Sequence, residues 1–320
     1  MAALQNGEPA DTMNRFVSCD WGTSRFRLRL IDGEPLRIAA EHVTDEGVQS
    51  LAANQTGEGE RHAILSGVLE RGLAALGLGH QPDLPIVMSG MASSTLGWQS
   101  LPYARLPAPI DGRTLRFTDF RHGPRRIRLI SGLQSANDVM RGEEVELVGI
   151  MADPSRQAWA DDSIVILPGS HSKHVQLVAG QIVGFTTYLT GELFSLLSQD
   201  STLKSPADPH FDPDAFVAGV RANQTHGLSA ALFQTRARTV LGQLAAGHSQ
   251  AFLSGVLIGA EITALAKTPT RYIVLAASQN LARQYLLALS ELLPGASVVS
   301  LAPTELALAL ARGHAKILTH

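Results

Sequence analysis

One pattern occurs twice in this chain of 320 residues: a short apolar strand, a tight loop of small and polar residues, and a second strand that returns. In the first half, the run Phe16–Asp20 precedes the loop Trp21-Gly22-Thr23-Ser24. In the second half, Ser163–Leu167 precedes Pro168-Gly169-Ser170-His171-Ser172-Lys173. Apolar residues at helical spacing occur in both halves, as in Gly59–Leu76. The sequence therefore predicts an α/β protein whose two halves begin in the same way.

The length of the chain suggests two domains of ordinary size. The segment Asp153-Pro154-Ser155 is typical of a break between elements, and we place the domain boundary there. Residues 1–15 hold no apolar segment of the kind that secretory signals require, so we expect a disordered tail. The predicted domains are then 16–155 and 156–320.

The composition is that of a globular protein, since 45% of the residues are apolar and 17% are charged. The net charge of −3 argues against nucleic acid as the main partner. Cys19 is the single cysteine, so no intrachain disulfide can form and a reducing compartment is expected. The apolar run Ala251–Ala266 contains Ser254, Glu261 and two glycines, which argues against a membrane span. We therefore expect a cytoplasmic protein.

The first loop has the residue types of a phosphate site. Asp20 ends a strand, and its carboxylate could hold Mg²⁺ through water, as phosphoryl transfer requires. Gly22 lets the backbone approach a ligand closely, and Thr23 and Ser24 add hydroxyls beside the N–H groups of the turn. An ordinary hairpin turn explains the same residues.

The second loop is of the same kind. Lys173 could neutralise phosphate charge there, and a solvated loop lysine is the alternative interpretation. Two such loops, one in each half, could close on a polyphosphate from both sides. We therefore expect Asp20 and Gly169 on opposite walls of one cleft.

Five short motifs in order resemble the 2-dehydro-3-deoxygalactonokinase family, over about Phe16 to the C-terminus. They are Cys19-Asp20-Trp21-Gly22-Thr23-Ser24, Met88-Ser89-Gly90-Met91, Asp138-Val139-Met140-Arg141-Gly142-Glu143-Glu144, Leu167–Lys173 and Leu189-Thr190-Gly191-Glu192-Leu193. The resemblance implies an ATP-dependent kinase of the actin/hexokinase/heat-shock-ATPase superfamily. Such an enzyme phosphorylates 2-dehydro-3-deoxy-D-galactonate at its 6-hydroxyl in galactonate breakdown. The implied fold is two ribonuclease-H-like α/β domains with ATP in the cleft between them.

The resemblance also implies site residues. Asp20 would lie near Mg²⁺, and the sugar acid would contact the segment Ser89-Gly90-Met91. The superfamily commonly carries paired glycines in the segment that contacts adenosine. This chain has Ala276-Ala277-Ser278 there, so its contacts to the nucleotide base depart from those of the superfamily. The implied nucleotide-binding residues are Asp20, Gly22, Thr23, Ser24, Gly169, Ser170, His171, Ser172, Lys173, Ala276, Ala277 and Ser278.

The catalytic base must come from outside the second loop, because that loop has Ser170 and His171 where many related sugar kinases have an aspartate. Asn137-Asp138 resembles the Asn-Asp pair of glucokinase-like relatives, in which the aspartate accepts the proton of the sugar hydroxyl. A helix is predicted from Asn137 to about Met151, so the alternative is that Asp138 only caps this helix.

Three further residues near this pair are candidates. Glu143 and Glu144 are alternative bases, and adjacent helical positions point about 100° apart, so we expect only one to face the site. Arg141 could pair with the substrate carboxylate, or form an ion pair along the helix with Asp138 or Glu144.

Two other functions fit the same motifs. The chain could be a kinase of the same superfamily for another sugar or aldonate, or a non-catalytic nucleotide-binding sugar sensor. The expected partners are a small sugar acid and ATP, without nucleic acid or membrane, and a homodimer is possible. The sequence does not distinguish epimers of the sugar.

Overall fold

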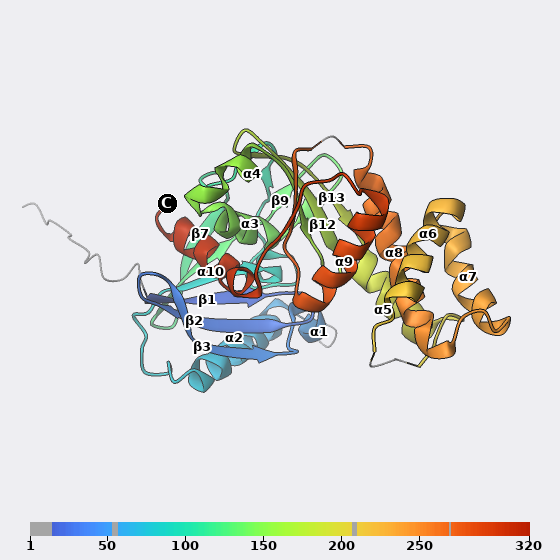
Figure 1. Ribbon diagram of the computed structural model, residues 1–320. Coiled ribbons are helices and arrows are strands. Elements are labelled where there is room, and N and C mark those ends of the chain that lie inside the picture. The colour runs from blue at the N-terminus through green and yellow to red at the C-terminus, as the bar shows by residue number, and fades with distance from the viewer. Residues whose placement is uncertain (1–14, 53–56, 207–209, 269) are drawn as a thin grey trace, which may run out of the picture. The chain divides into compact units, whose positions relative to one another are not determined.

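The computed structural model describes residues 15–52, 57–206, 210–268 and 270–320 (Figure 1). The chain divides into two compact units. The first unit holds the residues up to 157 together with 180–182 and 307–320, and the second unit holds 158–179 and 183–306. Of the tail predicted for residues 1–15, Arg15 begins a strand and the rest lies outside the described residues.

A six-stranded sheet forms the centre of the first unit. Its strands are β1 (Arg15–Trp21), β2 (Phe26–Asp32), β3 (Arg37–Thr44), β4 (Ile86–Gly90), β7 (Phe117–His122) and β8 (Arg125–Ile130). Their order in the sheet is β3-β2-β1-β4-β8-β7. β1 is antiparallel to β2 and parallel to β4, and β4 is parallel to β8. The edge strands β3 and β7 are antiparallel to their neighbours.

Helices cover both faces of this sheet. Val17 and Trp21 of β1 pack with Leu69 of α2 in one core cluster. Ser18 points to the opposite face, because side chains alternate along a strand, and it bonds to His314 of α10. The helices of this unit are α1 (Val48–Ala52), α2 (Glu58–Ala75), α3 (Glu143–Met151) and the greater part of α10 (Pro303–Leu318). It also has 3-10 turns at Met91–Ser93 and Pro154–Arg156. The short helix α4 (Gln157–Asp161) begins at the last residue of this stretch of the first unit and continues into the second unit.

Short strands complete the first unit. β5 (Ala104–Arg105), β9 (Leu133–Gln134) and β10 (Val139–Met140) form a small sheet in the order β10-β9-β5. β6 (Ala108–Pro109) pairs with Gln181 and Ile182, the first residues of the strand β13 (Gln181–Tyr188). Residues 180–182 therefore group with the first unit.

The second unit repeats the strand order of the first. Its strands are β11 (Asp162–Leu167), β12 (Ser172–Val178), β13 (Gln181–Tyr188), β14 (Tyr272–Leu275) and β15 (Val298–Ser300), in the order β15-β14-β11-β12-β13. β11 is antiparallel to β12 and parallel to β14, as β1 is to β2 and β4. Both units therefore have the ribonuclease-H-like order, and the predicted fold class is confirmed.

Helices of the second unit build a separate core. Ile164 and Ile166 of β11 pack with Ile258 and Ile262 of α8 in one buried cluster. At Gly255 of the same helix, a Cβ would strike the backbone of α6, so the two helices cross in close contact. The helices are α5 (Thr190–Asp200), α6 (Pro213–His226), α7 (Leu228–Val240), α8 (Ser249–Leu265) and α9 (Gln279–Leu292), with a 3-10 turn at Ala246–His248.

Two predictions about the chain's organisation need correction. The predicted boundary at 155/156 lies within two residues of the observed one, but residues 307–320 belong to the first unit. The reason is close packing of α10 on α3, where a Cβ at Gly149 or Gly313 would strike the backbone of the other helix. The helix predicted from Asn137 begins only at Glu143, because Val139 and Met140 pair with β9.

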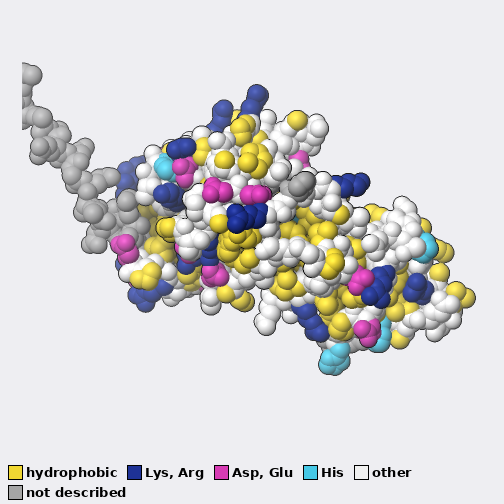
Figure 2. Space-filling model, turned by 45° about the horizontal axis from the view of Figure 1, so that its top comes forward, with side chains coloured by type: hydrophobic (Ala, Val, Ile, Leu, Met, Phe, Trp, Pro, Cys, Tyr) yellow, Lys and Arg dark blue, Asp and Glu magenta, His cyan; other side chains and the backbone are white. Residues whose placement is uncertain are grey.

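The surface agrees with the near-neutral charge. On the face drawn in Figure 2, Lys and Arg side chains alternate with Asp and Glu, and no continuous basic area is visible among the described residues. Within the described ranges, no helix is both long and apolar enough to cross a membrane.

Candidate active site

The carboxyl ends of β1 and β4 meet at one edge of the first unit's sheet, because the two strands are parallel. Asp20 lies opposite Ser89, and Trp21 lies opposite Gly90. Gly90 has a φ of +86°, and a Cβ there would lie 2.7 Å from the Trp21 carbonyl oxygen, so only glycine fits. A Cβ at Gly142 would lie 3.5 Å from the Gly90 Cα. The start of α3 therefore reaches the same edge of the sheet as Asp20.

Asp20 lies among other charged groups. Its side chain is 37% exposed, and Arg27 Nη1 lies 3.7 Å from its Oδ2. The pKa of Asp20 is raised, chiefly because the surrounding protein keeps water away. Arg27 and Arg29 oppose this rise, and the negative charge of Glu143 adds to it. Asp20 and Glu143 are therefore close enough to influence each other, and a cation beside them would relieve their repulsion.

The turn after Asp20 is fixed by hydrogen bonds between backbone groups. The Gly22 N–H donates to the Arg25 carbonyl at 2.9 Å, so it is already committed within the turn. The Gly22 and Thr23 carbonyls accept from the first N–H groups of α1, at Val48 and Gln49. The turn is fixed in place, while Ser24 is exposed and Thr23 is half-exposed.

The Arg141 side chain is fixed by an aromatic ring and by the 3-10 turn Met91–Ser93 that follows β4. Its Nη1 donates to the Ser93 carbonyl at 2.6 Å and to the Ser93 hydroxyl at 2.7 Å. Its guanidinium lies over the Tyr103 ring, 4.2 Å from the centroid. Arg141 directly follows β10 and precedes α3, so the alternative of an ion pair along a helix does not describe its position. The small sheet of β5, β9 and β10 brings Tyr103 and Arg141 together.

Asp138 is not a helix cap. It precedes β10, and the residue that precedes α3 is Gly142. The Asp138 Oδ1 accepts from the Val139 N–H at 2.7 Å, and its own N–H donates to the Ser135 hydroxyl at 3.0 Å. The carboxylate is half-buried and held in a loop, so the capping alternative is wrong.

The two glutamates at the start of α3 have different surroundings. Glu143 is half-buried, and its Oε2 accepts from the Arg141 N–H at 2.9 Å. Glu144 is fully buried, and both of its oxygens accept from the Gly142 N–H. Burial, with help from Glu143, raises the pKa of Glu144 to about 8. Glu144 is therefore protonated at neutral pH and out of reach of a substrate.

Replacing Glu144 by glutamine should leave the fold intact at pH 7, because the neutral amide has the shape of the protonated acid. The pKa of Glu144 is about 8 in the folded protein and about 4.5 in the unfolded chain. Glu144 therefore lowers the free energy of unfolding of the native protein, and this loss grows as the pH rises from about 4.5 to 8. The melting temperature of the variant relative to the native protein should therefore rise between pH 5 and pH 8. A flat difference across this range would contradict the assignment.

The Ser89 hydroxyl points into the core. It lies 2.9 Å from Nε2 of His314, whose Nδ1 lies 2.8 Å from the Ser18 hydroxyl. Burial lowers the pKa of His314 to about 3, so the ring is neutral and joins the ends of β1 and β4. Of the segment Ser89-Gly90-Met91, only Met91 has a partly exposed side chain.

The second-unit loop, which comprises residues Pro168 to Lys173, has an exposed part and a buried part. Gly169 and Ser170 are exposed, and His171 Nε2 lies 2.5 Å from the Glu192 carboxylate. Lys173 is 3% exposed and its Nζ donates to the His171 carbonyl at 3.0 Å, so the alternative of a solvated lysine is wrong. Ser172 is buried as well. Within this loop, Pro168, Gly169, Ser170 and His171 are at least partly exposed, whereas Ser172 and Lys173 are buried.

Helix α5 packs directly on this loop. The Glu192 N–H donates to the Ser170 carbonyl at 3.0 Å. A Cβ at Gly191 would lie 2.5 Å from the Gly169 carbonyl oxygen and 2.9 Å from the Ser170 Cα. The close contact therefore depends on glycine at position 191.

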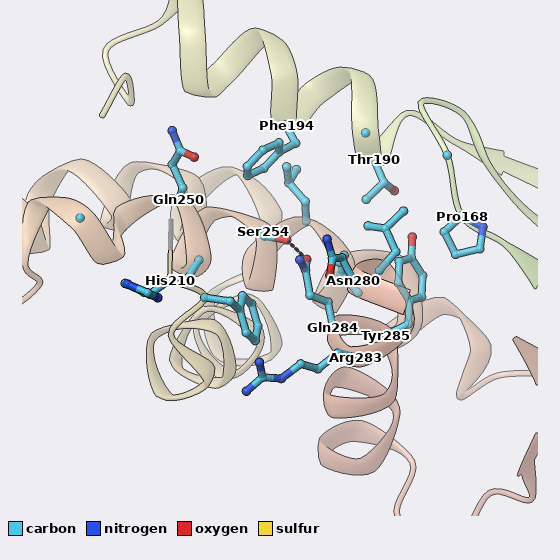
Figure 3. Close-up of a pocket in the computed structure, with 18 residues that line it drawn as sticks. Pro168, Thr190, Phe194, His210, Gln250, Ser254, Asn280, Arg283, Gln284 and Tyr285 are labelled. Carbon is cyan, nitrogen blue, oxygen red and sulfur yellow. Dashed lines mark hydrogen bonds between the residues drawn. The ribbon is translucent and has the colours of Figure 1, made fainter. Parts of the chain in front are cut away.

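A pocket of about 380 Å³ opens beside the loop, within the second unit (Figure 3). Phe194 points into it from α5, and Ser254 and Gln284 are joined across it by a hydrogen bond of 2.7 Å. Pro168, Thr190 and Tyr285 lie at one end, and His210, Gln250 and Arg283 lie toward the other (Figure 3). The lining combines apolar side chains such as Phe194, Leu257 and Ile258 with polar ones such as Ser254, Asn280 and Gln284. Such a mixed lining suits a heteroaromatic ring with hydrogen-bonding groups, and the volume suits a small ligand.

The segment predicted for the base lies beside this pocket. Ala276 and Ala277 are buried, and Ser278 precedes α9. The pocket wall is instead formed one turn later by Asn280, Leu281, Arg283, Gln284 and Tyr285 of α9.

Comparison with known proteins decides the family. The model of the 2-keto-3-deoxy-galactonokinase family matches residues 20–311. The chain belongs to this family. It is 35% identical over 264 residues to a Rhizobium meliloti (strain 1021) protein named "Probable 2-dehydro-3-deoxygalactonokinase DgoK1", covering 78% of this chain and 80% of the relative. It is 33% identical over 257 residues to the 2-dehydro-3-deoxygalactonokinase of Escherichia coli (strain K12), with the same coverage.

The family also includes a similar solved structure. A crystal structure from Sinorhizobium meliloti that carries the 2-dehydro-3-deoxygalactonokinase name is 32% identical, with a TM-score of 0.76. It covers 95% of this chain and 99% of its own. The family resemblance inferred from the five motifs is therefore confirmed.

Several residues of this 2-keto-3-deoxy-galactonokinase family member escaped the sequence analysis. Tyr103 and Ser93 gave no signal, because only the fold brings them to Arg141. Ser254 interrupts an apolar run in the sequence and lines the pocket. The motif Leu189–Leu193 was recognised without a role, and the structure shows it as the support of the second-unit loop.

Proposed function

We propose that this chain transfers the γ-phosphoryl group of ATP to the 6-hydroxyl of 2-dehydro-3-deoxy-D-galactonate, giving 2-dehydro-3-deoxy-6-phospho-D-galactonate in galactonate breakdown. The observation that carries the proposal is the pocket beside the Gly169 loop, in a chain of the 2-keto-3-deoxy-galactonokinase family. A ring-sized pocket next to an exposed glycine loop suits a nucleotide whose phosphates extend along the loop.

The base of ATP would occupy the pocket between Phe194 of α5 and the first turns of α9. Its phosphates would lie along Gly169, Ser170 and His171, the part of the loop that is accessible. In the first unit, the turn Gly22–Ser24 would also contact phosphate. The prediction that both loops face one cleft concerns the relation of the two units and stays a prediction.

Asp20 would hold Mg²⁺, with Glu143 close by. The donor chemistry fits, because Mg²⁺ is commonly bound by one or two carboxylates together with phosphates and water. Among the described residues, no three histidine, cysteine, aspartate or glutamate side chains gather as a metal site would require. When bound, Mg²⁺ supplies neutralisation of phosphate charge.

The acceptor would bind in the first unit. Arg141, oriented by Ser93 and Tyr103, would pair with the C1 carboxylate of the sugar acid. Asp138 would accept the proton of the 6-hydroxyl. The new bond joins that oxygen to the γ-phosphorus, and the bond from phosphorus to the bridging oxygen breaks, so that ADP leaves with the electron pair.

Replacing Gly191 by alanine should raise KM for ATP by about tenfold or more, because the new methyl group displaces the Gly169 carbonyl and with it the phosphate loop. KM for the sugar acid should change little. Steady-state kinetics with each substrate varied in turn measures both values.

Gly295→Ala is the matched control. A Cβ at Gly295 meets nothing within 4 Å, and this residue also lies in the second unit. Its kinetics should match those of the native protein. If the two variants behave alike, the loop is not held by Gly191.

An ADP-release assay tests the function. Purified protein with Mg²⁺-ATP should release ADP when 2-dehydro-3-deoxy-D-galactonate is added, and far less with no sugar acid. Equal turnover of another aldonate would favour a different sugar kinase. Nucleotide binding without turnover would favour a sensor.

A further inference from the structure

A buried carboxylate lies behind the second-unit loop. Glu261, in α8, is 1% exposed. Its Oε1 accepts from the Ser172 hydroxyl at 2.6 Å and from His174 Nε2 at 2.7 Å. Its Oε2 accepts from the Thr190 hydroxyl at 2.5 Å and from the Tyr285 hydroxyl at 2.8 Å. Four donors saturate the carboxylate, which has about four lone-pair sites.

The charge on Glu261 is what holds this arrangement together. Burial pushes its pKa upward, but the hydrogen bonds and the charge interaction with His174, together with the other donors, outweigh burial and leave the pKa below its ordinary value. The group is therefore a carboxylate at neutral pH. Losing the charge would leave several hydroxyls facing a poorer acceptor, which is costly because the carboxylate and its donors are buried.

The donors come from three separate elements around the loop. Ser172 and His174 stand at the start of β12, directly after the loop, and Thr190 begins α5. Tyr285 comes from α9. Thr190 and Tyr285 also line the pocket at the end where Pro168 lies (Figure 3). Glu261 thus joins the loop, its supporting helix and one pocket wall, although it does not itself line the pocket.

The His174 ring is buried beside Glu261 and contacts an aromatic ring. Its Nδ1 is buried and has no hydrogen-bond partner among the described residues. Its ring lies 4.7 Å from the Tyr188 ring. An unpaired buried nitrogen costs free energy, and the short contact between Nε2 and Glu261 opposes that cost.

We propose that Glu261 is a positioning residue that fixes Ser172, and through it the loop, for the phosphates of the nucleotide. This inference rests on the proposed function. Glu261 does not touch the nucleotide, and it acts at the loop end of the pocket. The end near His210 and Gln250 should bind a base without it (Figure 3).

Titration calorimetry with ATP and with adenosine tests the proposal. Glu261→Gln keeps the size of the side chain and removes its charge. We expect the Kd for ATP to rise by about tenfold or more, since hydrogen bonds to charged groups are lost, while the Kd for adenosine changes by less than about twofold. A purely structural role would not separate the two ligands.

Two further variants keep the test decisive. Ser172→Ala removes the loop's own bond to Glu261, together with the longer bond that the Ser172 hydroxyl accepts from the Tyr285 hydroxyl at 3.4 Å. It should weaken ATP in the same direction, so it carries the test if Glu261→Gln does not fold. Ile262→Val, a buried neighbour in α8, should lower the melting temperature without a ligand-specific effect. Equal weakening of ATP and adenosine, or no weakening in the folded variants, overturns the proposal. Native protein that binds no ATP overturns the proposed function, and this inference with it.

Discussion

Replacing Asp20 by asparagine should lower kcat by about 10²–10³-fold, the usual cost of removing one group that stabilises charge in a transition state. The fold should survive. Asp20 is partly exposed, its pKa is raised by burial and by Glu143, and a neutral amide removes that repulsion. Single-turnover kinetics at saturating ATP and Mg²⁺, with the melting temperature of both proteins, measures the effect.

Asp32 provides the matched control. It ends β2 in the same sheet, but β2 is antiparallel to β1, so Asp32 lies at the opposite edge from Asp20. There it pairs with Arg37 at 3.3 Å. Asp32→Asn should keep kcat within about twofold, because exposed ion pairs contribute little. If Asp20→Asn were equally mild, the metal role of Asp20 would be wrong.

Asp138→Asn should lower kcat by about 10²–10⁴-fold with little change in KM, because the amide keeps the shape of the side chain and cannot accept a proton. The loop hydrogen bond from the Val139 N–H can still form to the amide oxygen, so the melting temperature should hold. Steady-state kinetics over a range of sugar-acid concentrations separates kcat from KM.

Two variants make this result interpretable. Arg141→Ala should mainly raise KM for the sugar acid, by about 10–100-fold, because it removes a charged binding partner. If Asp138 is the base, Glu143→Gln should raise the Mg²⁺ concentration needed for activity, because Glu143 lies beside Asp20, and should keep most of kcat at saturating Mg²⁺. A nearly normal kcat in Asp138→Asn with a large loss in Glu143→Gln at saturating Mg²⁺ would transfer the base role to Glu143.

Local pattern was enough to predict the framework of the fold. The two loops, at Gly22 and at Gly169, were placed correctly because a strand, a tight turn and a returning strand are encoded within about fifteen consecutive residues. The helix α2 was predicted in the same way, because its apolar residues recur at helical spacing within consecutive residues. The end of the chain was misassigned, because the packing of Gly313 on α3 is a contact between distant segments.

The candidate site was only partly predictable. Asp138 and Arg141 were named from a short motif, but the partners that orient Arg141 are Ser93 and Tyr103, which precede it by 48 and 38 residues in the sequence. Glu261 was visible as a charge within an apolar run, yet the run gives no information about the four donors that surround it. The pocket wall on α9 is likewise a product of tertiary packing.

The carbon that carries the new phosphate group shows which reaction the protein catalyses. The protein is incubated with Mg²⁺-ATP and 2-dehydro-3-deoxy-D-galactonate, and the product is analysed by phosphorus–proton correlation NMR. We expect one phosphate ester, coupled to the two protons on C6, formed in equal amount with ADP. A phosphate on another carbon, or ADP released without any sugar phosphate, would contradict it.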